Sequence, residues 1–213
     1  LALGEANRGV FVDRPERITA GFFAAELSKD FSWVRARASL AWASGDGNPF
    51  DGRGEGFDAI FENPLFAGAD TSFWIRQPVP LIGGGRVSLS GRNGMLNSLR
   101  PSKEFGQSNF VNPGLRLAGV GVDLDLTPTL RLSGNLNYLT FDDTAVLEVA
   151  RAQAGIDREI GLDASLAVIW RPLAIQNVVA RLSVASLVPG AGYRALYGDE
   201  RAYSVLGNQV LTY

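Results

Sequence analysis

The chain of 213 residues carries a net charge of −2 at neutral pH and contains neither cysteine nor histidine. These counts exclude thiolate metal sites, bis-histidine haem and Ser-His-Asp catalysis, and the near-neutral charge argues against a nucleic-acid partner. No apolar run reaches the ~18 residues of a transmembrane helix. The 25 glycines and 12 phenylalanines favour many short strands, so we expect an all-β protein with one domain over residues 1–213.

Apolar and polar residues alternate with a period of two in nine segments of the chain. Side chains on a strand point alternately to opposite faces, so each segment predicts a strand with one apolar and one polar face. In the clearest segment, Leu40 and Trp42 share one face and Arg35 and Arg37 share the other. Each segment is close to the ~9–11 residues that a tilted strand needs to cross a bilayer. In chain order they are residues 17–27, 33–43, 73–81, 86–95, 115–126, 130–141, 159–170, 178–187 and 203–213.

Short and long connections alternate along the whole chain. The short ones are residues 28–31, 83–85, 127–129 and 173–176, and the long ones are residues 44–71, 96–114, 142–158 and 188–202. Transmembrane barrels have short periplasmic turns and long outer loops, whereas a soluble β-sandwich has no reason to separate them in this way. The pattern predicts an antiparallel transmembrane β-barrel, with a short helix at residues 144–154 in one outer loop.

Aromatic residues on the apolar faces lie near both ends of the predicted strands. Trp42, Tyr138 and Tyr203 lie near the long loops, and Trp170 and Tyr213 lie near the short turns. Barrels in membranes carry such aromatic girdles at both interfaces. The alternative is the general preference of aromatic residues for strands, but that preference does not explain why both ends are occupied on the apolar face.

The polar faces carry arginine and carboxylate side chains but no lysine. On these faces we place Arg35, Arg37, Arg76, Arg86, Arg92, Arg131 and Arg181, together with Glu26, Asp123, Asp125, Glu159 and Asp163. Fixed charges that line a pore select solutes of opposite charge, and arginine suits carboxylates and phosphates. An equally weighted alternative is a network of arginine–carboxylate pairs that only braces the wall.

The first long loop places Asp46, Asp51 and Asp58 among glycines. Several oxygen ligands on a flexible backbone are what calcium requires, but the spacing does not match an EF-hand. Solvated turn residues are the favoured interpretation, so we expect neither a metal ion nor a cofactor. The run Gly83-Gly84-Gly85 lacks a following Lys-Ser or Lys-Thr, which indicates a tight turn rather than a phosphate-binding loop.

Six longer segments of the chain are informative when read whole. They are SGDGNPFDGRGEGFDAIFENPLFAG, SFWIRQPVPL, NSLRPSKEFGQSNFVNPGL, LTPTLRLSGNLNYLTFDDT, IGLDASLAVIWRPL and the terminal NQVLTY. Together they resemble porin-like outer-membrane barrels of the alginate-export type. The resemblance covers most of the chain. It implies a pore in the outer membrane of a Gram-negative-type bacterium, without fixing the solute, and it implies barrels with far more than nine strands.

The expected function is therefore a channel that passes or exports polar or anionic solutes through an arginine-lined lumen, and the chain is not expected to be an enzyme. Its expected surroundings are the lipid bilayer, with a homo-oligomer or other envelope proteins as possible partners. A second hypothesis is a structural barrel that anchors or sheathes partner subunits, and a third is a soluble β-sandwich binding protein.

The number of predicted strands bears on how the barrel closes. Nine alternating strands that end on the periplasmic side require the first strand, at residues 17–27, to run inward from an outer loop. Single-chain bacterial barrels have an even number of strands and begin on the periplasmic side. We therefore expect residues 1–213 to be the C-terminal part of a larger barrel, with one edge of the first strand unpaired within the chain.

Overall fold

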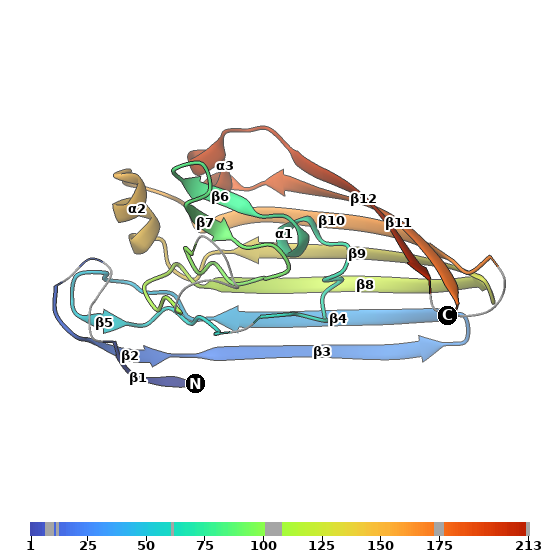
Figure 1. The fold of residues 1–213 in the computed structure, drawn as a ribbon, viewed down its shortest axis with the longest axis horizontal. Helices are drawn as coiled ribbons and strands as arrows, with labels where there is room; N and C mark the ends of the chain where they lie inside the picture. Colours follow the sequence, from blue (N-terminus) through green and yellow to red (C-terminus); the bar gives the residue numbers. More distant parts are fainter. Residues whose placement is uncertain (7–10, 12, 61, 101–107, 173–176, 212–213) are drawn as a thin grey trace.

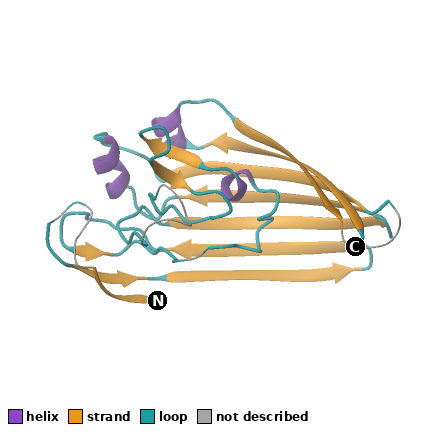
Figure 2. Ribbon diagram, viewed as in Figure 1, coloured by secondary structure: helices purple, strands orange, loops and turns teal. Residues whose placement is uncertain are grey.

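The largest sheet of the protein has seven antiparallel strands (Figures 1 and 2). The computed structural model describes residues 1–6, 11, 13–60, 62–100, 108–172 and 177–211. The order across the sheet is β12-β11-β10-β9-β8-β4-β3, and every neighbouring pair is antiparallel. The strands are β3 (Phe22–Phe31), β4 (Val34–Ala43), β8 (Leu115–Thr127), β9 (Leu130–Thr140), β10 (Glu159–Trp170), β11 (Val178–Pro189) and β12 (Ala202–Leu211).

Long and short connections lie at opposite ends of the sheet, as the alternation of loop lengths predicts (Figure 1). Ser32 and Trp33 form the turn between β3 and β4, and two residues join β8 to β9 at the same end. At the other end, α2 (Ala145–Arg151) lies between β9 and β10, and α3 (Ala191–Tyr197) lies between β11 and β12. The helix expected at residues 144–154 is thus confirmed. The short connection expected at residues 173–176 lies outside the described residues.

Two of the nine predicted spanning strands are wrong. Residues 44–114, which we call the insert, join β4 to β8 and include α1 (Phe73–Arg76), β6 (Val79–Ile82) and β7 (Val87–Ser90). β6 and β7 pair only with each other, so residues 73–81 and 86–95 do not belong to the large sheet. Gly83, Gly84 and Gly85 all have positive φ angles in the turn between them, which confirms the tight turn.

The N-terminal part also differs from the prediction of one strand at residues 17–27. β1 (Ala2–Ala6), β2 (Glu16–Ala20) and β5 (Arg53–Gly54) form a separate three-stranded sheet at the long-loop end. The chain leaves this sheet at Gly21, whose N–H donates to Ser44 Oγ at 2.9 Å. A Cβ atom at Gly21 would lie 2.9 Å from the Trp42 ring, so glycine allows β3 to begin in close contact with β4.

The large sheet is open within the described residues. β3 pairs only with β4, and β12 pairs only with β11. The predicted unpaired edge is therefore present over residues 22–27 of the first predicted strand, whereas residues 17–20 belong to β2, which pairs with β1 and β5. Because six antiparallel pairings separate β3 from β12, both edge strands run in the same direction, from the long-loop end to the short-turn end.

The two faces of the sheet are exposed in the opposite sense to those of a water-soluble sandwich. On the outer face, Leu40, Val120 and Leu166 are 57%, 59% and 51% exposed. On the inner face, which the insert covers, Asn137 is 2% exposed and Asp163 is 0% exposed. The predicted division into an apolar and a polar face is thus correct, and the polar face is the one that other parts of the chain cover.

The hydrophobic core lies between the insert and the long-loop half of the inner face. Leu115, Leu139 and Leu187 of the sheet are fully buried there, and they belong to the same cluster as Trp74 and Leu89 of the insert. Towards the short turns the inner face becomes polar, because serine, asparagine, aspartate and arginine replace these leucines. Within the described residues, no helix is long and apolar enough to cross a membrane.

Candidate functional site

Asp163, on the inner face of β10, anchors the insert to the sheet. Its carboxylate accepts hydrogen bonds from the backbone N–H groups of Phe73 at 3.2 Å and Trp74 at 3.0 Å, and from Ser72 Oγ. Ser72 also caps α1, since its Oγ accepts a hydrogen bond from Ile75 N. Asp163 was predicted to line the pore, and the structure instead shows it buried beneath α1.

Residues just before α1 also contact the sheet. Asn137 Nδ2 donates to the carbonyl of Ala67 at 2.8 Å, and Ala67 N donates to Glu26 Oε2 at 2.9 Å. Gly68 has a φ angle of 66°, and a Cβ atom there would lie 2.2 Å from Asn135 Cγ. Only glycine fits this position without displacing Asn135 of the sheet, so the insert packs tightly against the inner face here.

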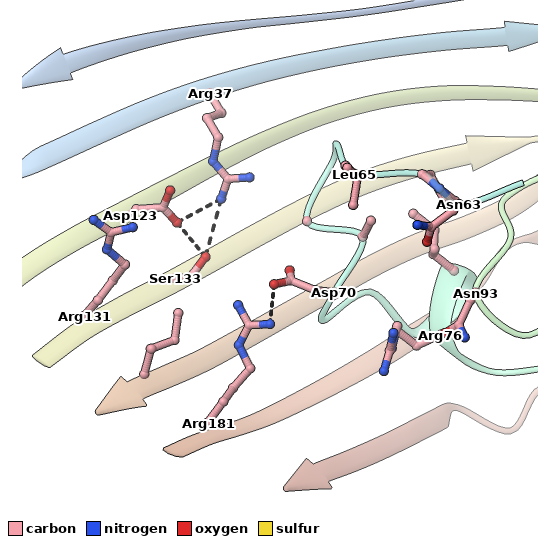
Figure 3. A pocket seen from close by; sticks show the side chains of 15 residues that line it. Arg37, Asn63, Leu65, Asp70, Arg76, Asn93, Asp123, Arg131, Ser133 and Arg181 are labelled. Atoms are coloured by element: carbon pink, nitrogen blue, oxygen red, sulfur yellow. Dashed lines mark hydrogen bonds and ion pairs between the residues drawn. The ribbon is translucent and has the colours of Figure 1, made fainter. Parts of the chain in front are cut away.

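A cavity of about 330 Å³ remains on the inner face, on the short-turn side of these contacts (Figure 3). In Figure 3 the arginine side chains of β4, β9 and β11 extend into it from the strands, and side chains of the insert line another side. The polar side chains that line the cavity are Arg37, Asp123, Arg131, Ser133 and Arg181 of the sheet, and Asn63, Asp70, Arg76 and Asn93 of the insert.

Each of the four predicted arginines on the sheet has a carboxylate partner. Arg131 forms a two-pronged pair with Asp125, with distances of 2.6 and 2.8 Å. Arg37 Nη2 lies 3.0 Å from Asp123 Oδ1. The other two pairs are Arg35 with Asp30 and Arg181 with Asp70. These contacts favour the bracing interpretation for the wall, because each positive charge is offset by a nearby negative charge.

The three remaining predicted arginines do not lie on the wall. Arg76 belongs to α1, so it lines the cavity from the insert rather than from a spanning strand. Arg86 follows the glycine turn and Arg92 follows β7; both are exposed, and neither lines the cavity. Within the part of the chain that the structure describes, none of the three forms an ion pair.

Sequence reasoning missed the polar residues that the insert contributes. Asp70, Asn63 and Asn93 all line the cavity. They lie in irregular backbone, where no two-residue period marks a face. Asn93 has a φ angle of 58°, a conformation that asparagine tolerates better than most residues. No signal in the sequence would have found these three.

The predicted girdle residues lie on the outer face where the structure describes them. Trp42, Tyr138, Tyr203 and Trp170 are 40%, 45%, 79% and 51% exposed, and Tyr213 lies outside the described residues. Trp42 Nε1 donates to Asp142 Oδ1 at 3.0 Å, and Tyr138 Oη donates to Glu159 Oε1 at 3.3 Å. The rings are thus exposed while two of their polar tips are hydrogen-bonded, an arrangement that interfacial aromatic residues adopt.

The acidic residues of the first long loop do not assemble into a metal site. Asp58 forms a buried ion pair with Arg100 at 3.0 Å, whereas Asp46 and Asp51 accept backbone hydrogen bonds within their own turns. No group of three potential ligands among the described residues could hold a metal ion. Burial, together with the nearby negative charges of Asp51, Glu55 and Glu16, raises the pKa of Asp46 to about 7, although the hydrogen bond from Asn48 N opposes this shift.

Comparisons with protein-family models, with curated proteins and with solved structures give no match for this chain. The resemblance to alginate-export barrels therefore stays a prediction from the quoted segments.

Proposed function

We propose that the chain forms part of the wall of a transmembrane β-barrel channel in a bacterial outer membrane, which passes or exports polar or anionic solutes. The observation that carries the proposal is the reversed exposure of the two faces. Along the middle of the sheet, aliphatic side chains such as Leu166 and Leu182 are more than half exposed, while Ser183 and Asn137 on the other face are buried. Such a sheet suits hydrocarbon outside and polar contents inside.

Physical chemistry disfavours the soluble β-sandwich for this arrangement. A sandwich is stabilised by burying its apolar faces, at about 25 cal/mol for each Å² removed from water. Here the apolar face of all seven neighbouring strands carries no covering element within the described residues, and the insert covers the polar face instead. In a lipid bilayer these exposed apolar side chains would contact hydrocarbon instead of water, which would stabilise the sheet.

The open edges indicate how the wall is completed. β3 and β12 run in the same direction, so antiparallel closure requires an odd number of additional strands. Seven strands and an odd number of further strands give the even total of single-chain bacterial barrels. We infer that these strands come from residues outside 1–213 or from another chain. Conductance measured with residues 1–213 alone and with the complete gene product distinguishes the two sources.

A second candidate function is a structural barrel, and the ion pairs of the arginines on the sheet favour it. Each of Arg35, Arg37, Arg131 and Arg181 has its own carboxylate partner, as expected for a wall that is braced rather than selective. A barrel that anchors or sheathes envelope partners would need such a braced sheet but no unpaired charge in its interior. Conduction separates the candidates, because an anchor need not conduct ions.

The membrane arrangement is tested with two adjacent single-cysteine variants. The chain contains no cysteine, so each introduced thiol is unique. Leu27 is 78% exposed on the outer face of β3, and Ser28 is exposed on its inner face opposite Arg37. In lipid vesicles, we expect a charged thiol reagent to modify Ser28→Cys but not Leu27→Cys. Rapid labelling of both variants would contradict the bilayer arrangement, since Leu27 is fully accessible in a soluble protein.

Channel activity is tested in planar lipid bilayers with the completed barrel, either unmodified or carrying Ser133→Cys. Ser133 lines the cavity, so a bulky thiol reagent at that position should reduce the size of the conductance steps. Leu136→Cys on the outer face of the same strand is the matched control and should conduct without change. Correctly inserted protein that gives no conductance steps would refute the channel and favour the structural barrel.

A further inference from the structure

We expect a charged solute in the cavity to interact most strongly with a side-chain charge that has no ion-pair partner. Three arginines of the sheet line the cavity, and all three are ion-paired: Arg37 with Asp123, Arg131 with Asp125 and Arg181 with Asp70. A paired guanidinium has already committed donors to its carboxylate, and the local charge of the pair is close to zero. The sheet therefore provides little net charge at this point.

Arg76 differs from these arginines in its partners. It lines the same cavity from α1, and within the described residues no hydrogen bond or ion pair involves its side chain. Arg76 is half-buried. Its guanidinium can offer all five donors to a solute.

The backbone that carries Arg76 is held in place by the sheet. Asp163 binds the first turn of α1 through Ser72, Phe73 and Trp74, and the preceding residue Ile75 is 1% exposed in the hydrophobic core. A charged side chain on such a fixed turn has a restricted set of positions. Pre-organisation of this kind lowers the entropic cost of contacting a ligand.

Two neutral side chains of the insert complete the unpaired polar lining. Asn63 and Asn93 line the cavity near Arg76, as Figure 3 shows, and the described residues provide no hydrogen-bond partner for either amide. Each amide offers donors and an acceptor without adding charge. The cavity of about 330 Å³ is in the size range of small-molecule sites.

We infer that Arg76, together with Asn63 and Asn93, forms the solute-contacting side of the cavity, and that Arg76 gives the cavity its preference for a small solute bearing an oxyanion. The wall arginines brace the sheet and have little influence on charge selectivity. This inference depends on the proposed channel function. It assigns charge selectivity to Arg76 of the insert rather than to the arginines of the spanning strands. The planar guanidinium of Arg76 is suited to a carboxylate or phosphate group.

The test measures the reversal potential of the completed barrel in planar bilayers under a potassium chloride gradient. We expect Arg76→Gln to lower the chloride-to-potassium permeability ratio at least about five-fold, the change that one unit charge at about 4 Å produces in water-like surroundings. Arg76→Glu should invert the preference. Inorganic phosphate added at millimolar concentration should reduce the current of the unmodified protein more than that of Arg76→Gln.

Two controls separate this effect from a general loss of charge. Arg86→Gln removes an unpaired arginine of the same insert that does not line the cavity, and should leave the permeability ratio unchanged. The charge-neutral double variant Asp30→Asn with Arg35→Gln removes one bracing pair and should also leave the ratio unchanged. Heat-modifiable mobility on gels shows that each variant is folded before its conductance is recorded.

The outcomes distinguish this inference from the proposed function. If the unmodified protein conducts and Arg76→Gln keeps its permeability ratio, the assignment of Arg76 is wrong and the channel proposal is unaffected. If Arg86→Gln shifts the ratio as much as Arg76→Gln, the effect comes from total charge, which also overturns the assignment. If the inserted, folded protein never conducts, the proposed function itself fails.

Discussion

Replacing Val205 by arginine tests whether the outer face contacts lipid. Val205 is 63% exposed on β12 and pairs with Val184, which in turn pairs with Leu166 in the middle of β10. In a water-soluble protein, arginine at so exposed a position changes stability by no more than about 0.5 kcal/mol. At the centre of a bilayer the same change costs about 2–4 kcal/mol on a barrel surface.

The adjacent residue provides the matched control. Leu206 is the next aliphatic side chain on the same strand, but it lies on the inner face opposite Ser183. Folding into lipid vesicles is followed across a urea titration, with folded protein identified by its heat-modifiable mobility. A loss of 2 kcal/mol lowers the folded-to-unfolded ratio of Val205→Arg roughly 30-fold. Equal folding of Val205→Arg and Leu206→Arg would refute the assignment of the outer face to lipid.

Three further predictions concern the insert and the first long loop. Gly68→Ala should lower the free energy of unfolding by about 1–3 kcal/mol more than Gly84→Ala. Both glycines have φ near 67°, but only a Cβ atom at residue 68 would lie against Asn135, so equal urea midpoints for the two variants would contradict this. Asp163→Asn should make the insert more accessible to trypsin while the sheet stays folded. The substitution removes a carboxylate that accepts three hydrogen bonds, which should weaken the attachment of the insert by about 1–3 kcal/mol. Unchanged proteolysis would show that the hydrophobic core alone holds the insert. Burial raises the pKa of Asp46 from 3.8 to about 7, so the folded state binds the proton more tightly, and stability should fall between these pH values and level off above pH 7. Asp46→Asn should remove this pH dependence, stabilising the protein above pH 7 by up to about 4 kcal/mol, and an unchanged pH profile of the urea midpoint would count against it.

The sequence by itself determined which residues share a face of each strand. Alternation is a local property, since the two-residue period of a strand follows from backbone geometry. For that reason Leu40, Val120 and Leu166 were assigned correctly to the apolar face, and Ser39 and Asn137 to the polar one. The lengths of the connections similarly predicted which end of the sheet carries α2 and the long loops.

Tertiary contacts decided where residues 73–95 lie. Phe73, Ile75 and Val79 alternate as in a strand, but α1 forms because Asp163, about ninety positions further along the chain, accepts hydrogen bonds from its first turn. A period of two over so few residues does not distinguish a spanning strand from a helical turn followed by a short strand. The hydrogen-bond partners of the first turn make that distinction, and they are remote in sequence.

Tertiary structure also decided which charges are free. The sequence placed seven arginines on polar faces, but whether each is paired depends on strand register and on the path of the insert. Arg131 meets Asp125 across the β8–β9 pair, and Arg181 meets Asp70 only because the insert returns to the inner face. Ion pairing requires two groups within about 4 Å, and no local pattern encodes that proximity for residues far apart in the chain. Arg76 is therefore distinguished from the other arginines by the fold and not by its sequence neighbours.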